Sequence, residues 1–162
     1  MKGVGTPEYY NGADIECDKE CQWWTLGAKT YIKSVCDRIE KLLETPLKNT
    51  GLPLFAGDHP EMDDTDLLVP SAIPIYQMMI RCLQWAVTLG CYDVQYATNI
   101  LARFGQKPRD VYLKRALRVF GYLNFYTRGK LYLDPSPISY EGIYFKDEDW
   151  MEHYPDVEEY KG

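Results

Sequence analysis

A cluster of carboxylates is the first candidate for chemistry in this 162-residue sequence. The segment "EMDD" at residues 61–64 places Glu61, Asp63 and Asp64 together, and divalent cations prefer carboxylate oxygens as ligands. A catalytic aspartate pair that holds two metal ions is expected on a strand hairpin whose apolar flanks fix both carboxylates. These carboxylates lie instead in a proline-bounded stretch of acidic residues. We therefore interpret residues 58–66 as a solvated acidic loop that docks on basic side chains.

Basic side chains gather in a later segment. Residues 103–130 carry eight Lys or Arg side chains and one acidic one, although the whole chain has a formal net charge of −6. Such an array can neutralise nucleic-acid phosphates without regard to base sequence. Charge alone equally supports a second interpretation, in which this face is solvated and pairs with the chain's own acidic connector and tail. The candidate nucleic-acid-binding residues are Arg103, Lys107, Arg109, Lys114, Arg115 and Arg118.

Other catalytic patterns are missing from the sequence. It holds no glycine-rich phosphate loop, no His-Glu-x-x-His helix and no nucleophile elbow. Cys17 and Cys21 could be imagined as zinc ligands together with His59 and His153, but their spacing fits no common zinc site. The sequence therefore predicts no catalytic residue, no metal site and no cofactor.

The elements that position these residues follow from hydrophobic periodicity. Residues 7–27 are typical of two short strands with a charged turn at 18–20. Residues 28–44 predict an amphipathic helix, and prolines and glycines in 45–70 predict an extended connector that lies over a surface. The apolar positions of the helix are Ile32, Val35, Cys36, Ile39, Leu42 and Leu43.

Three more helices are predicted after the connector, at about 71–89, 93–104 and 108–125, joined by short loops. The first has an apolar face made of Ile75, Met78, Met79, Cys82, Trp85, Ala86 and Leu89. We expect Trp85 and Phe104 in the core of this three-helix unit. Residues 129–137 predict one short strand, followed by an acidic, aromatic tail. The expected fold class is α+β, mainly helical.

A membrane span and a secreted protein are both disfavoured. The apolar stretch 75–94 contains Arg81, and a charge near the middle of a bilayer span costs about 3 kcal/mol. The five cysteines form no recognisable framework, and the first residues lack the apolar core of a secretion signal. We therefore expect an intracellular protein, in the cytoplasm or nucleus, with no membrane partner.

Five segments occur in an order that points to one family. They are "PEYYNGADIE", "GAKTYIKSVCDRIEKLL", "GDHPEMDDTDLL", "YQMMIRCLQWAVTLGCYDVQYATNILARF" and "KPRDVYLKRALRVFGYL". Together they resemble reverse transcriptases of copia-type long-terminal-repeat retrotransposons, from about residue 7 to residue 155. The resemblance implies a fragment: the end of the palm, then the thumb and connection region of an RNA-directed DNA polymerase.

The resemblance also implies a division of the chain and a limit on its activity. Residues 1–44 correspond to an end-of-palm-like hairpin and helix, 45–70 to an acidic connector, 71–128 to a thumb- and connection-like unit, and 129–162 to a strand and acidic tail. The family's Tyr-x-Asp-Asp hairpin would lie upstream and its ribonuclease H domain downstream. The chain by itself is thus expected to be no enzyme. It is expected to bind an RNA or DNA duplex backbone weakly and nonspecifically at most.

Several positions depart from the family pattern, namely Asn11, Arg81, Cys91, Tyr92 and Tyr112. We interpret these departures as sequence drift. The alternative function is a non-enzymatic, α-helical protein-interaction module that uses its acidic tail and exposed aromatic residues. The sequence leaves the oligomeric state open.

Overall fold

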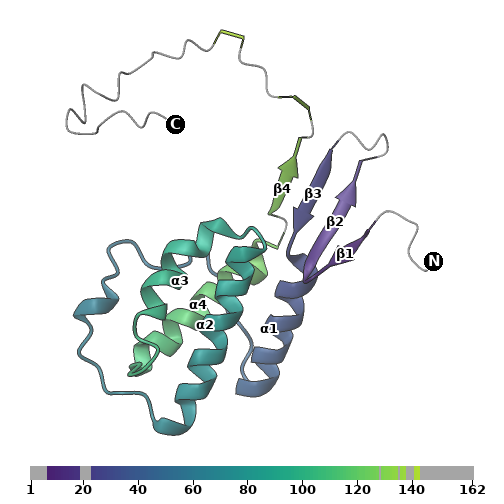
Figure 1. Cartoon of the computed structure of the whole chain (residues 1–162). Helices are drawn as coiled ribbons and strands as arrows, with labels where there is room; N and C mark the ends of the chain where they lie inside the picture. Colours follow the sequence, from purple (N-terminus) through teal and green to yellow (C-terminus); the bar gives the residue numbers. More distant parts are fainter. Residues whose placement is uncertain (1–6, 19–22, 128, 135, 138–140, 143–162) are drawn as a thin grey trace, which may run out of the picture.

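The computed structural model describes residues 7–18, 23–127, 129–134, 136–137 and 141–142. In this part of the chain, four α-helices pack together and a four-stranded antiparallel sheet extends from one end of the helical body (Figure 1). The expected α+β, mainly helical class is confirmed. Most of the acidic tail predicted for 138–162 lies outside the described residues.

The sheet has the strand order β1-β2-β3-β4, with β1 at Tyr9–Tyr10, β2 at Ala13–Cys17, β3 at Trp24–Gly27 and β4 at Lys130–Leu133. Residues 7–18 and 23–27 thus contain three strands, and the prediction of two was wrong. The extra hairpin arises because Asn11 and Gly12 form a two-residue turn with φ values of 50° and 93°. Positive φ at both positions is typical of a type I′ turn, for which Asn-Gly is the preferred sequence. Asn11, interpreted above as drift, therefore has a local structural role.

Helix α1 spans Lys29–Leu43 and ends at Glu44, which adopts the left-handed conformation. A carboxylate oxygen of Asp14 on β2 accepts a 2.8 Å hydrogen bond from the backbone N–H of Thr30 and so links the sheet to the first turn of the helix. The helix buries the predicted residues Ile32, Val35, Cys36 and Ile39. Leu42 is 50% exposed, so its predicted burial was wrong. It lies in the last turn, at the edge of the apolar stripe.

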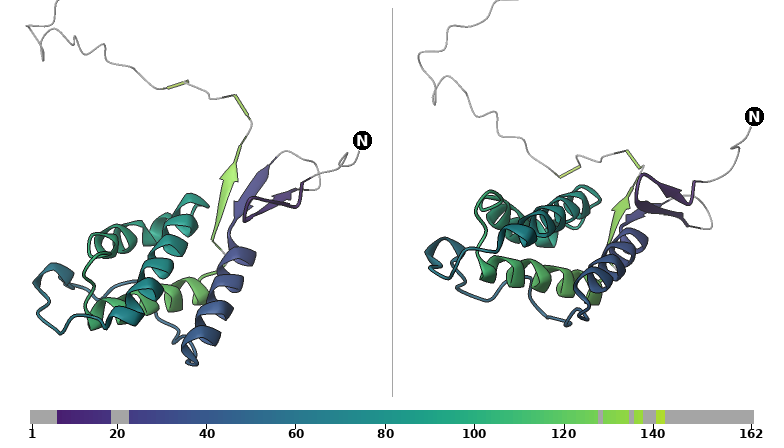
Figure 2. Two further views of the ribbon diagram at one scale, coloured as in Figure 1. Left: turned by 60° about the horizontal axis from the view of Figure 1, so that its bottom comes forward. Right: turned by 90° about the horizontal axis from the view of Figure 1, so that it is seen from below.

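The three predicted helices are α2 (Ile73–Thr88), α3 (Gln95–Ala102) and α4 (Asp110–Phe125). Helix α2 is central and contacts α1, α3 and α4 (Figure 2). Within the described residues, no helix is long and apolar enough to cross a membrane. The apolar stretch quoted above is instead the middle of this helical core.

The buried face of α2 differs from the predicted one. Tyr76, Met79 and Leu83 are fully buried, whereas Trp85 is 37% exposed, so placing Trp85 in the core was wrong. Trp85 lies instead under the β1–β2 turn, where a Cβ atom on Gly12 would be 3.0 Å from its Nε1. Phe104 is half-buried, and its ring centroid lies 4.5 Å from that of Tyr112.

The connector between α1 and α2 runs alongside the helical body and contains two single-turn 3₁₀ helices, at Pro60–Met62 and Pro70–Ala72. Its first part lies directly on α4, because a Cβ atom on Gly121 would be only 2.1 Å from the carbonyl oxygen of Lys48. The expected connector lying over a surface is confirmed. One hydrophobic core includes residues of all four α-helices, and the proposed division at residues 44, 70 and 128 stays a prediction.

Candidate nucleic-acid interface on helix α4

The six predicted cations come from one corner of the structure, the α3–α4 loop and α4. Arg103 follows α3, Lys107 lies in the loop and Arg109 precedes the first residue of α4. The remaining three lie on α4 itself, namely Lys114, Arg115 and Arg118. Arg103, Lys107 and Lys114 are exposed, whereas the other three are partly buried.

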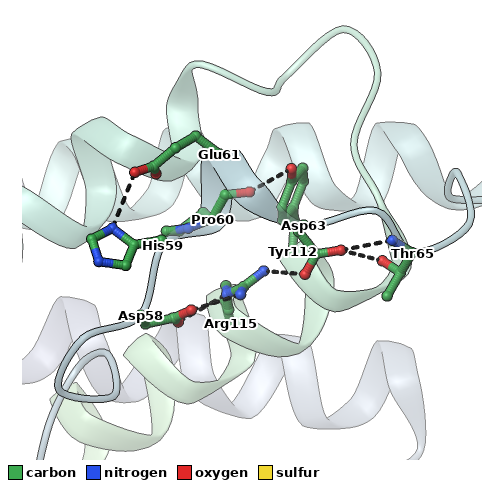
Figure 3. Close-up of polar contacts among 8 residues, drawn as sticks. All are labelled: Asp58, His59, Pro60, Glu61, Asp63, Thr65, Tyr112 and Arg115. Atoms are coloured by element: carbon green, nitrogen blue, oxygen red, sulfur yellow. Dashed lines mark hydrogen bonds and ion pairs between the residues drawn. The ribbon is translucent and has the colours of Figure 1, made fainter.

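Arg115 is held by two carboxylates of the connector (Figure 3). Its Nε and Nη2 atoms donate to the two carboxylate oxygens of Asp58 at 2.8 and 2.6 Å, and its Nη1 atom donates to Asp63 at 2.8 Å. The three side chains are only 13%, 10% and 9% exposed. Hydrogen bonds from the guanidinium to Asp58 and Asp63 raise the pKa of Arg115 above its usual range. A bidentate pair of this kind is strong and geometrically specific.

Asp63 is fixed from a second side by Thr65, whose hydroxyl and backbone N–H donate to the same carboxylate oxygen at 2.6 and 3.0 Å. The hydroxyl hydrogen bond from Thr65, with further help from its backbone N–H and from Arg115, lowers the pKa of Asp63 to about 2. Asp64, the adjacent carboxylate of the "EMDD" segment, is exposed. The two aspartates therefore lie in different environments.

Further hydrogen bonds attach the same connector to the start of α4. The buried hydroxyl of Tyr112 donates to the carbonyl oxygen of Pro60 at 2.8 Å. The backbone N–H of Leu68 in the connector donates to the carbonyl oxygen of Pro108 at 2.8 Å. The backbone N–H of Asp110 on α4 donates to the carbonyl oxygen of Asp66 at 3.1 Å. Arg109 also donates to the carbonyl oxygen of Thr65. The predicted docking of the acidic loop on basic side chains is confirmed, but Asp58 and Asp63, which make the contact, are nearly buried rather than solvated. Tyr112, another departure from the family pattern, is part of the attachment.

Arg118 has an aromatic partner. Its guanidinium carbon lies 3.7 Å from the ring centroid of Phe55, a distance typical of a cation–π contact. The hydroxyl of Thr50 donates to the backbone carbonyl of Arg118 at 3.1 Å. The buried Nε atom of Arg118 makes no hydrogen bond to any residue in the described part of the chain.

The structure therefore brings the six predicted residues together but divides them by role. Arg109, Arg115 and Arg118 bind the connector, whereas Arg103, Lys107 and Lys114 remain exposed around it. Nucleic-acid contact by any of the six stays a prediction. Sequence reasoning did not single out Asp58, Phe55 or Tyr112 as partners. The acidic run at 58–66 was a sequence signal for Asp58, but no pattern in the sequence indicated Phe55 or Tyr112.

Among the described residues, no group of three or more His, Cys, Asp or Glu side chains could hold a metal ion. Cys21 and His153, two of the four residues considered for zinc, lie outside those residues.

Comparisons with known proteins relate the chain to a transposon protein. No protein-family model matches the chain, and no solved structure matches it. The chain is 31% identical over 127 residues to the Saccharomyces cerevisiae protein described as "Putative transposon Ty5-1 protein YCL074W". The match covers 76% of this chain and 38% of the yeast protein, so the chain spans well under half of its relative. This similarity supports a retrotransposon-related origin for the chain.

Proposed function

We propose that the chain is the end-of-palm, thumb and connection part of a copia-type reverse transcriptase. We further propose that it contributes weak, sequence-independent contacts to the backbone of a template–primer duplex. The observation that carries the binding proposal is the group of exposed cations Arg103, Lys107 and Lys114 at the α3–α4 corner. The similarity to a yeast transposon protein supports the family part of the proposal. An intracellular location belongs to the same proposal.

The expected binding is modest, because three of the six candidate cations are engaged by the connector. Three cations can neutralise about three phosphates, so the slope of log K against log salt should be about −2.7. If all six cations reached phosphates, the slope would be about −5.4. Nonspecific dissociation constants of about 10⁻⁴–10⁻⁶ M at physiological salt are expected.

The chain is proposed to have no polymerase activity of its own. Metal-assisted nucleotidyl transfer needs carboxylates that converge on two ions. Asp63 is instead bound to Arg115 and Thr65, while Asp64 is exposed. Primer extension with magnesium or manganese should therefore give no product. Extension that is lost in the Asp63→Asn, Asp64→Asn double variant would contradict this part of the proposal.

The binding part is tested by fluorescence anisotropy with a labelled RNA–DNA hybrid over a range of salt concentrations. Lys107→Glu combined with Lys114→Glu should abolish binding, because both side chains are exposed at the proposed interface. The matched control is Lys29→Glu combined with Lys33→Glu, which makes the same charge change on the exposed side of α1. This control should bind like the unchanged chain.

The second candidate function is a non-enzymatic protein-interaction module. The exposed aromatic side chains, such as Tyr92 and Tyr96, favour it. Absence of duplex binding at every salt concentration would replace the nucleic-acid proposal with this one. Equal loss of binding in the control and the test variant would mean that only net charge matters and that no local interface exists.

A further inference from the structure

A groove of about 720 Å³ lies between the end of α1, the start of the connector and α4. Apolar side chains from all three segments line it, namely Leu43, Leu47, Phe55, Val111, Leu113 and Leu117. This volume falls in the range of sites that enclose large side chains or small ligands. Neither the proposed nucleic-acid contacts nor the hydrogen bonds of the connector account for so apolar a surface.

Cations surround this apolar groove. Lys48 and Lys114 are exposed lining residues, and Arg118 lines it beside the ring of Phe55. Of the described residues that line the groove, only Asp58 is acidic, and it is already paired with Arg115. None of these three cations has an acidic partner among the described residues. An apolar groove with such cations at its margin fits a peptide that carries aromatic side chains between carboxylates. A nucleic-acid backbone would match these cations but would leave the apolar surface without a partner.

The chain itself contains a segment of this composition. Residues 147–160, "DEDWMEHYPDVEEY", hold seven Asp or Glu residues, no Lys or Arg, and the aromatic residues Trp150, Tyr154 and Tyr160. We infer that this acidic aromatic segment binds the α1–α4 groove of the same chain. Its rings would contact the leucines, and its carboxylates would pair with Lys48, Lys114 and Arg118.

The connection is long enough for binding within one chain. Strand β4 begins at Lys130, opposite Gly27 at the end of β3 and so beside the start of α1. The groove lies at the other end of α1, about 22 Å away for a helix of 15 residues. Strand β4 runs away from the groove and so adds about 10 Å to the distance that the following residues must span. Residues 134–146 can span up to about 45 Å, which exceeds the total of about 32 Å.

The test uses the full chain with the photo-crosslinking amino acid p-benzoylphenylalanine in place of Trp150, without nucleic acid. After illumination, mass spectrometry should find crosslinks mainly to peptides that contain 43–55 or 111–118. The same amino acid in place of Tyr132, an exposed residue of β4, serves as the control and should give no crosslink to these peptides. Crosslinks from position 150 that are absent or spread evenly over the surface would overturn the inference.

Two further arms make the result specific. Lys48→Glu with Lys114→Glu should lower groove crosslinking about tenfold, since two attractive charge pairs become repulsive. Lys29→Glu with Lys33→Glu should leave it unchanged, and an equal drop in both variants would contradict a local site.

Mixing ¹⁴N- and ¹⁵N-labelled chains should give crosslinks within one isotope only. Mixed-isotope crosslinks would show a groove that binds a second copy and would overturn binding within the chain. Because no nucleic acid is present, failure here leaves the proposed duplex binding untouched.

Discussion

The guanidinium of Arg115 on α4 donates hydrogen bonds to both carboxylate oxygens of Asp58, a residue 57 positions earlier in the chain. The pair is nearly buried and is completed by Asp63. It joins the acidic connector to helix α4. The stability of this junction and of the core around it can be tested by substitution.

Arg115→Ala should destabilise the protein by about 3 kcal/mol, because removal of one partner leaves buried carboxylates without compensation. Arg115→Lys should recover only part of this loss, since an ammonium cannot form the bidentate pair. Urea unfolding followed by circular dichroism measures both. Lys114→Ala, at the exposed neighbouring position, should stay within about 0.5 kcal/mol of the unchanged chain. A similar loss in Lys114→Ala would argue against a specific role of the pair.

Protonation of Asp63 should weaken the fold at low pH. Its pKa is lowered from 3.8 to about 2 in the folded chain, first by the Thr65 hydroxyl. A depressed folded pKa stabilises the folded state above the unfolded pKa, and this contribution disappears as the pH falls from about 4 to about 2. Urea midpoints at pH 7, 4 and 2.5 should therefore fall less steeply for Asp63→Asn than for the unchanged chain. Identical pH profiles would mean that Asp63 does not contribute.

Gly121→Ala should destabilise the protein by about 1–3 kcal/mol, because the added methyl group would meet the connector backbone at Lys48. The connector would have to move away from α4. Gly51→Ala is the matched control within the connector, since a Cβ atom there meets nothing within 4 Å. Thermal unfolding of the two variants should separate them clearly. Equal melting temperatures would show that the connector can move away from α4 without a loss of stability.

Leu83→Ala and Trp85→Ala compare the two sides of α2. Leu83 is fully buried, so its truncation should cost about 3 kcal/mol. Trp85 is partly exposed and lies under the β1–β2 turn, so its truncation should cost less. Chemical unfolding of both variants measures the difference. A larger loss for Trp85→Ala would restore the buried position that the sequence pattern predicted for it.

The helices were predictable because their apolar residues recur at helical spacing. The orientation of α2 was not, since apolar side chains surround most of that helix and only its neighbours decide which ones are buried. The Asn11–Gly12 turn was readable from the dipeptide itself but was missed beside longer strand patterns. Tertiary contacts alone determine that Arg115 rather than Lys114 pairs with Asp58, because adjacent residues point to different sides of a helix.

The opposing charges of the candidate site were also visible in the sequence, but their division was not. An acidic run and a basic run predict attraction without indicating which cations are used. The aromatic contact between Phe55 and Arg118 depends on the path of the connector, which has no periodicity to predict it.

The pairing of β3 with β4 has a consequence for synthesis of the protein. It joins residues 24–27 to residues 130–133, about 100 residues later, and so closes a very long loop. At a translation rate of about 5–20 residues per second, the edge of β3 stays unpaired for about 5–20 s before β4 is synthesised. During that interval the nascent β2–β3 hairpin presents unpaired backbone N–H and C=O groups to any other chain nearby. We therefore expect the N-terminal sheet to be the part of the molecule most exposed to misassembly on the ribosome.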